Sequence, residues 1–281
     1  LAAGQTAPAH ISQLASVSWT GNANDGKWST ADNWSALAGN VTVHPVPDGV
    51  NVAAVVIPSG AGSVDFDTTV STSLQSLSSS RPLNISAGTL QVAAPIGLAD
   101  FTQTGGALQG SQGMTVSNSF AQSGGSITLG GSLNVTQTSG NLTVGTITAP
   151  SLSLSANNGA IGQTGAIQTA SLFAVSSQGS NLSNSGNRID KFQAVNTSAG
   201  NVNLVNGVPL EIAGINNNGG SINVVNTGGI TTTGLVRSAN HDVSLTANSP
   251  LTVGAPGIQA GGNIVLIATN LTSAGNVTIN G

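Results

Sequence analysis

The sequence predicts an all-β protein built as a single-stranded parallel β-helix, and three observations lead to that fold class. Short apolar-polar-apolar segments recur about every 20 residues, glycine and asparagine stand between them, and no window of about eleven residues has a helical period. A compact sandwich would not return to one register so regularly. A coil that cannot bury its apolar face alone instead stacks on the next coil. We therefore predict a β-solenoid of about 20 residues per coil with an N-terminal cap.

The repeat is visible in two columns of apolar residues that share this period. Spacings within the first column run from 15 to 21 residues, and within the second from 18 to 21. The first column is Leu90, Leu108, Ile127, Leu142, Ile161, Leu182, Val202, Ile222, Val243 and Ile264, and the second is Leu172, Phe192, Leu210, Ile230, Leu251 and Leu271. Two columns with one period define a coil with at least two sides.

Within each unit the residues alternate as they do in a short strand with one buried face. Ile222, Asn223 and Val224 are one example, and Gly-Gly or Asn-Gly pairs follow such segments where a corner is needed. We expect the apolar residues to point into the bore and the glycines and asparagines to turn the corners. With strands about 4.8 Å apart, roughly ten coils would form a rod on the order of 50 Å long.

The chain divides into three predicted segments. Residues 1–18 form an extended N-terminal segment, residues 19–80 form a tryptophan-containing cap with the first irregular coils, and residues 81–281 form the regular coils. All three tryptophans lie between positions 19 and 34, and a cap would cover the strand edges of the first coil. The final "LTSAGNVTING" stops in mid-repeat, so we expect that the chain continues or that this end meets a partner.

Charged residues are scarce, and this scarcity excludes some classes of binding partner. Five Lys and Arg stand against nine Asp and Glu, so no basic face can neutralise a nucleic-acid backbone. The longest apolar run, residues 52–57, is far shorter than the roughly 20 residues of a membrane helix. We expect neither nucleic-acid binding nor membrane insertion. Cysteine is absent, which leaves no disulfide or thiolate metal ligand.

Two stretches resemble a known family. The Gly-Gly-x-Ile-x-Leu coils, with "SLSLSANNGAIGQTGAIQTASLFAVSS" (151–177) and "NSGNRIDKFQAVNTSAGNVNLVN" (184–206), resemble the β-helical shaft of filamentous-haemagglutinin-type bacterial exoproteins. The segment "WTGNANDGKWSTADNW" (19–34) is similar to an element that precedes strand repeats in related surface proteins. The resemblance implies a right-handed β-helix exported by a Gram-negative bacterium to its cell surface or extracellular matrix, used for attachment or as a fibre.

We therefore expect a secreted structural or adhesive protein, either an adhesin shaft or a building block of an extracellular biofilm-matrix filament. Its expected partners are other copies of itself, through end-to-end assembly, or glycans of a host or matrix surface. In such an assembly the last coil would stack on an open edge near the N-terminus of the next chain, and residues 1–17 could act as a donated strand. The alternative is a carbohydrate-binding module for surface or matrix polysaccharide.

A polysaccharide-degrading enzyme is the third expectation. Such β-helical enzymes need converging carboxylates, and after position 67 the remaining acidic residues do not stand one coil apart in register. These residues are Asp100, Asp190, Glu211 and Asp242. We expect no catalysis, cofactor or metal. Asp65 and Asp67 share one strand face, where a solvated acidic surface is favoured over a cation site.

The tryptophan cluster is the best candidate for a binding site. Trp19, Trp28 and Trp34, accompanied by Asp25, Asp32 and Asn33, would provide an apolar platform flanked by hydrogen-bonding groups, as a sugar ring requires. The competing interpretation is that the rings plug the open end of the solenoid as core residues.

Overall fold

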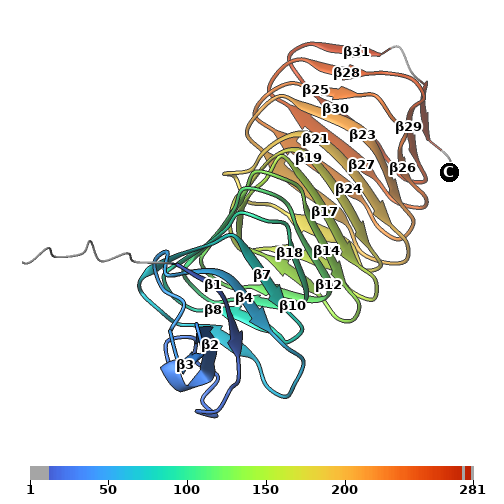
Figure 1. Ribbon diagram of the computed structural model, residues 1–281. Helices are drawn as coiled ribbons and strands as arrows, with labels where there is room; N and C mark the ends of the chain where they lie inside the picture. The colour runs from blue at the N-terminus through green and yellow to red at the C-terminus, as the bar shows by residue number, and fades with distance from the viewer. Residues whose placement is uncertain (1–12, 274–275, 280–281) are drawn as a thin grey trace, which may run out of the picture.

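The computed structural model describes residues 13–273 and 276–279. It is a parallel β-solenoid of about 11 turns with about 20 residues per turn, preceded by a cap that contains a mixed sheet. Figure 1 shows the coils stacked from the blue N-terminal cap to the red C-terminal end. The predicted fold class is confirmed. Among the described residues no helix is long and apolar enough to cross a membrane.

Each coil contributes to three columns of parallel strands. The first column contains β5 (Val64–Phe66), β8 (Leu83–Ile85), the second halves of β10 (Ile96–Gln103) and β12 (Met114–Gln122), β15 (Leu142–Val144), β18 (Ile161–Gln163), β20 (Ser180–Leu182), β22 (Val202–Asn206), β24 (Ile222–Asn226), β27 (Val243–Ala247) and β30 (Ile264–Ile267).

The second column contains β6 (Ser71–Leu74), β9 (Thr89–Val92), β11 (Ala107–Gly110), β13 (Ser126–Leu129), β16 (Thr146–Thr148), the first halves of β19 (Ile167–Ser176), β21 (Arg188–Asn196) and β23 (Leu210–Asn217), then β25 (Ile230–Thr232), β28 (Leu251–Val253) and β31 (Leu271–Ser273).

The third column contains the first halves of β10 and β12, β14 (Leu133–Gln137), β17 (Ser151–Ala156), the second halves of β19, β21 and β23, then β26 (Val236–Ser238), β29 (Gly257–Ala260) and β32 (Asn276–Ile279).

The predicted apolar columns need two corrections. Leu90, Leu108 and Ile127 lie in the second column of strands, whereas the residues from Leu142 onward lie in the first. The 15-residue spacing between Ile127 and Leu142 marks this switch. All faces carry the same alternation, so the period alone does not tell which face a segment occupies.

Two rungs are also displaced by two residues. Ser180, rather than Leu182, stacks between Ile161 and Val202. In the same way Phe192 stacks on Ile212 rather than on Leu210. Leu172 and Phe192 continue the third column of strands from Leu152, whereas Leu210 and Ile230 lie in the second. A two-residue shift keeps the buried face buried, because alternate side chains of a strand point the same way. The apolar pattern alone therefore does not reveal such shifts.

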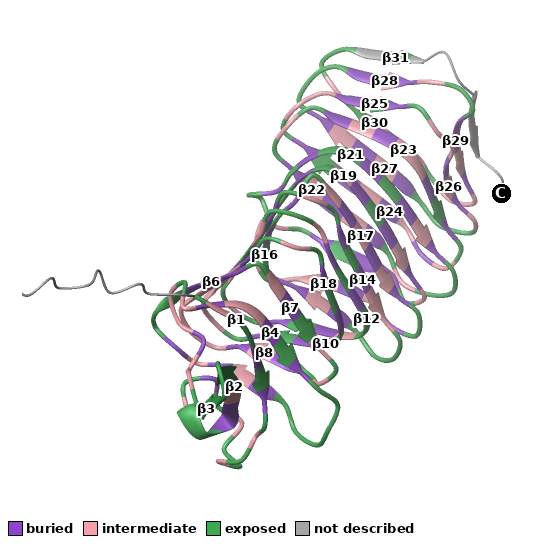
Figure 2. Cartoon of the chain, viewed as in Figure 1, coloured by how far each residue is buried: buried purple, intermediate pink, exposed green. Residues whose placement is uncertain are grey.

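The core is a set of apolar ladders that run along the rod. Figure 2 shows buried and more exposed residues alternating along the strands of successive coils. Leu152, Leu172, Phe192 and Ile212 form one such ladder, and each of the four is buried. Removing this apolar surface from water favours stacking of each new coil.

Buried amides line several corners of the solenoid. Asn196 stacks on Asn217 and Asn206 stacks on Asn226, and all four side chains are buried. Nδ2 of Asn206 donates to Oδ1 of Asn226 at 3.1 Å. The expectation that asparagine helps to turn the corners is met, and these amides also pair backbone groups that would otherwise be buried without a partner.

The cap covers the edges of the first coil. A mixed sheet has the order β3 (Val41–Val43), β2 (Trp34–Ala38), β1 (Leu14–Trp19), β4 (Val52–Ile57) and β7 (Ser76–Ser79), and a short 3-10 helix (Ala31–Asn33) precedes β2. β7 pairs with β4. The backbone N–H of Ser73 in β6 donates to Gly49, and that of Gln75, just after β6, donates to Ala53. Asp65 of β5 exchanges backbone hydrogen bonds with Gly26 and Trp28.

In the described part of the chain, backbone groups of the cap bond to Asp65 of β5 and to Ser73 and Gln75, on the side of the first coil where the last coil of another copy would stack. Whether copies assemble end to end stays a prediction. Of the predicted donated strand, residues 1–17, the part from Leu14 to Val17 pairs with β4, and Nε2 of Gln13 donates to the carbonyl of Val50. Residues 1–12 lie outside the described residues.

Candidate functional site

The three tryptophans of the predicted sugar platform lie in the core of the cap. Trp28 and Trp34 are fully buried and Trp19 is 3 % exposed. The rings meet edge to face, with centroids 4.7 Å apart for Trp28 and Trp34 and 4.9 Å apart for Trp19 and Trp34. Phe66 packs against Trp28 in the same way at 5.1 Å. None of the rings presents an open face to a sugar, so their burial favours the core interpretation.

Hydrogen bonds from two indoles hold the cap together. Nε1 of Trp28 donates to the carbonyl of Pro47 at 2.7 Å, and Nε1 of Trp34 donates to the carbonyl of Trp28 at 2.7 Å. Nε1 of Trp19 is buried without an acceptor among the described residues. A small cavity next to this ring is bordered by Arg81, whose guanidinium donates to the carbonyls of Pro58 and Ala61.

The polar residues of the predicted platform organise the loop between β1 and β2. The carboxylate of Asp25 accepts hydrogen bonds from the backbone N–H of Lys27, from Thr30 Oγ1 at 2.7 Å and from Asn33 Nδ2 at 2.6 Å. These bonds, the one from Lys27 foremost, lower the pKa of Asp25 to about 2. Asn33 is fully buried, whereas Asp32 is exposed and contributes its backbone carbonyl to Thr20.

The two carboxylates considered for a cation serve the junction between cap and coils. Asp65 accepts from Nδ2 of Asn84, one coil further along, at 2.7 Å. Asp67 accepts from the backbone N–H and the hydroxyl of Ser29, at 2.9 and 2.8 Å. Among the described residues no group of three or more His, Cys, Asp and Glu side chains is placed to hold a metal ion.

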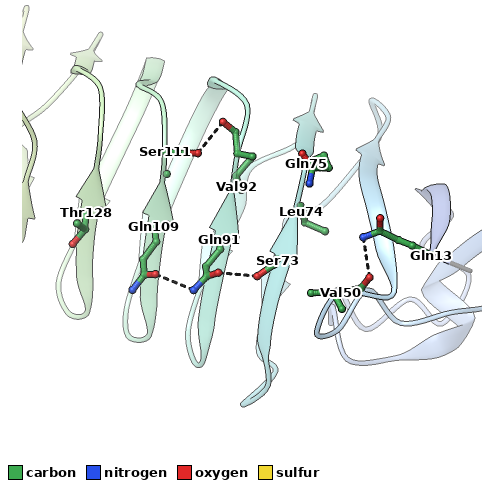
Figure 3. A pocket seen from close by; sticks show the side chains of 12 residues that line it. Gln13, Val50, Ser73, Leu74, Gln75, Gln91, Val92, Gln109, Ser111 and Thr128 are labelled. Carbon is green, nitrogen blue, oxygen red and sulfur yellow. Dashed lines mark hydrogen bonds between the residues drawn. The ribbon is translucent and has the colours of Figure 1, made fainter. Parts of the chain in front are cut away.

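A groove of about 540 Å³ lies where the cap meets the second column of strands. Figure 3 shows Gln13 and Val50 of the cap on one side, and side chains from successive coils on the other. Because Leu74 and Leu90 point into the core, the alternate residues Ser73 and Gln91 point outward. Of the twelve residues that line this groove, none is charged.

A hydrogen-bonded ladder forms the floor of the groove. Ser73, Gln91, Gln109 and Thr128 occupy equivalent positions in β6, β9, β11 and β13. The hydroxyl of Ser73 donates to Oε1 of Gln91 at 2.7 Å, and Nε2 of Gln91 donates to Oε1 of Gln109 at 3.0 Å (Figure 3). Within the described part of the chain, Nε2 of Gln109 donates to no protein group, so the ladder ends in a free amide donor. We call this floor the glutamine ladder.

The glutamine ladder is absent from the predicted site, although the sequence contains a signal for it. Gln91 and Gln109 are separated by 18 residues, which matches the local coil length between Leu90 and Leu108. Following the residue after each buried leucine would have found the outward column. The cap side of the groove, formed by Gln13 and Val50, could not be found in this way, because its position depends on how β1 and β4 pack.

The chain was also compared with known proteins. Neither protein-family models, nor curated proteins, nor solved structures gave a match. What the molecule shows about its class is therefore its architecture, a parallel β-solenoid with a mixed-sheet cap.

Proposed function

We propose that this protein is a secreted structural or adhesive rod, serving as the shaft of an adhesin or as a building block of an extracellular filament. The observation that carries the proposal is the continuous parallel pairing of strands from one coil to the next. Each coil adds backbone hydrogen bonds and one rung to each apolar ladder, so such a rod gains length by repetition. A shaft that holds a binding surface away from a cell needs this property.

The outward surface supports the same role. Strand faces carry neutral polar ladders, such as Asn223, whose Nδ2 donates to Oδ1 of Asn203 one coil earlier at 3.0 Å. The one ion pair among the described residues joins Lys191 and Glu211 on adjacent coils at 2.9 Å. Amides and hydroxyls on such a surface form hydrogen bonds with water and with side chains of neighbouring coils.

The resemblance of the coils to filamentous-haemagglutinin-type shafts adds the cellular setting to the proposal. A shaft of that type is exported by a Gram-negative bacterium and stays at its surface or in its matrix. The cap then protects the first coil from edge-to-edge pairing with other strands, which is the hazard of an open β-solenoid end.

Antibody labelling of intact cells of the source organism tests the proposal. We expect label on unpermeabilised cells or on the material between them, and weaker attachment of cells that lack the gene. Label that appears only after permeabilisation would contradict the proposal. Electron microscopy of the purified chain at rising concentration separates the two forms of the role, because a filament protein gives long fibres and a shaft segment gives single rods on the order of 50 Å long.

A further inference from the structure

We propose that the groove above the glutamine ladder binds an uncharged polysaccharide chain that lies along the solenoid axis. The inference rests on the proposed adhesive role, since it names the class of ligand that the rod would hold. It also moves carbohydrate recognition away from the tryptophans, which are buried, to a surface that the solvent reaches.

The chemistry of the lining selects the ligand class. A carboxylated or sulfated polysaccharide needs Arg or Lys within reach, and the groove contains neither. Sugar hydroxyls both donate and accept hydrogen bonds, as do the side-chain amides of Gln91 and Gln109. The free donor at Nε2 of Gln109 has no competing protein partner among the described residues, and the exposed side chain of Val50 offers an apolar surface to the C–H face of a sugar ring.

The geometry of the groove indicates a polymer rather than a single sugar. The groove is open to solvent and spans four successive coils, from Ser73 to Thr128. Equivalent side chains repeat along it at the strand spacing of about 4.8 Å. A chain of sugar rings that follows the axis meets a hydrogen-bonding group at each of the four rungs, whereas a chain that crosses the axis meets at most the pair on one coil, such as Ser73 and Gln75.

The ladder is also held in place before any ligand arrives. Gln91 is fixed at both ends of its amide, by the hydroxyl of Ser73 and by Oε1 of Gln109. On the opposite wall, Nε2 of Gln13 donates to the carbonyl of Val50 at 2.8 Å. Side chains that are already ordered lose little conformational entropy on binding, which favours affinity.

Retardation in native gels that contain a polysaccharide tests the proposal directly. The neutral probes are dextran, laminarin, galactomannan and soluble cello-oligosaccharides, and the acidic probes are alginate and polygalacturonate. We expect at least one neutral probe to retard the chain, and the double variant Gln91→Ala/Gln109→Ala to bind that probe about tenfold more weakly, since two hydrogen-bonding amides are lost.

The matched control is Gln168→Ala/Gln193→Ala, which removes two outward amides from β19 and β21, outside the groove. This control should bind like the unaltered chain, and circular dichroism should show the same strand content in both double variants. The proposal is overturned if no neutral probe is bound, if only acidic probes are bound, or if the two double variants weaken binding equally.

The two proposals fail in different ways. If antibodies label the cell surface but no neutral polysaccharide binds, the proposed polysaccharide site is wrong and the proposed adhesive or structural role stands. If a neutral polysaccharide binds in a way that depends on Gln91 and Gln109, but antibodies find the protein only inside the cell, the proposed adhesive role is wrong and the proposed polysaccharide site stands.

Discussion

Nδ2 of Asn196 donates a hydrogen bond to Oδ1 of Asn217 at 2.8 Å, from one coil to the next. Both side chains are fully buried at a corner of the solenoid. Nδ2 of Asn217 in turn lies within hydrogen-bonding distance of the carbonyls of Gly220 and Ser221, at 2.8 and 3.0 Å. The amide ladder therefore takes the place of water as the partner of a buried turn.

Replacing Asn217 by alanine should destabilise the rod. The substitution removes the acceptor of the Gly219 backbone N–H and of Asn196 Nδ2. It also takes one of two donors from the carbonyls of Gly220 and Ser221. Each buried polar group that loses a partner costs about 1–3 kcal/mol. We expect the free energy of unfolding to fall by at least about 2 kcal/mol, measured by urea denaturation followed by circular dichroism. The neighbouring Asn218 is exposed, so Asn218→Ala should change the free energy of unfolding by only about 0.5 kcal/mol. Equal losses from the two variants would mean that burial of the amide is not what matters.

Trp28→Ala should destabilise the cap through a cavity. The ring is fully buried against Trp34 and Phe66, and truncation of a buried aromatic side chain costs about 3–5 kcal/mol. Chemical denaturation followed by the fluorescence of the remaining tryptophans measures this loss. Phe173 is partly exposed on the shaft, and Phe173→Ala should cost much less. A Trp28→Ala chain of undiminished stability that no longer binds glycans would restore the sugar-platform hypothesis.

Gly125→Ala should be destabilising because of backbone conformation. Gly125 has a φ of +71°, and an added Cβ would press on the backbone oxygens of Gly105 and Gly106. The left-handed conformation alone costs about 1–2 kcal/mol for a residue with a Cβ. Gly97 lies in a strand with open space beside it, so Gly97→Ala should leave stability unchanged or raise it by about 0.5 kcal/mol. Thermal unfolding of the two variants compares these positions, and a stable Gly125→Ala chain would refute the argument.

The cap should lose stability in acid as Asp25 becomes protonated. The pKa of Asp25 is lowered from 3.8 to about 2 in the folded chain, so its contribution is fully present above pH 4 and is lost as the pH falls towards 2. Asp25→Asn removes this pH dependence. We expect the melting temperature of the unaltered chain to fall more steeply between pH 4 and pH 2 than that of the variant. Asp32→Asn, which alters an exposed carboxylate, is the control and should keep the steep fall.

The solenoid could be predicted from the sequence because its determinants are local. Ile222 and Val243 stand 21 residues apart and stack as expected, since a coil of that length returns the chain to the same face. The rungs at Ser180 and Ile212 could not be predicted, because a two-residue shift preserves the alternation of buried and exposed positions.

The candidate site was harder to predict for a different reason. The tryptophan cluster is rare in composition, and composition does not distinguish an exposed ring from a buried one. The glutamine ladder is made of common residues whose importance comes from stacking and from the wall that Val50 provides. Only the packing of the cap against the coils brings these groups together.

The lack of charge in the groove has a consequence for where the protein can work. Dissolved salt weakens attraction between exposed ions, with a screening length of about 8 Å at physiological ionic strength. Contacts made by neutral amides and hydroxyls contain little that mobile ions can screen. Binding through the glutamine ladder should therefore be as strong in concentrated salt as in fresh water, whereas an adhesin that relies on opposite charges would dissociate as salinity rises.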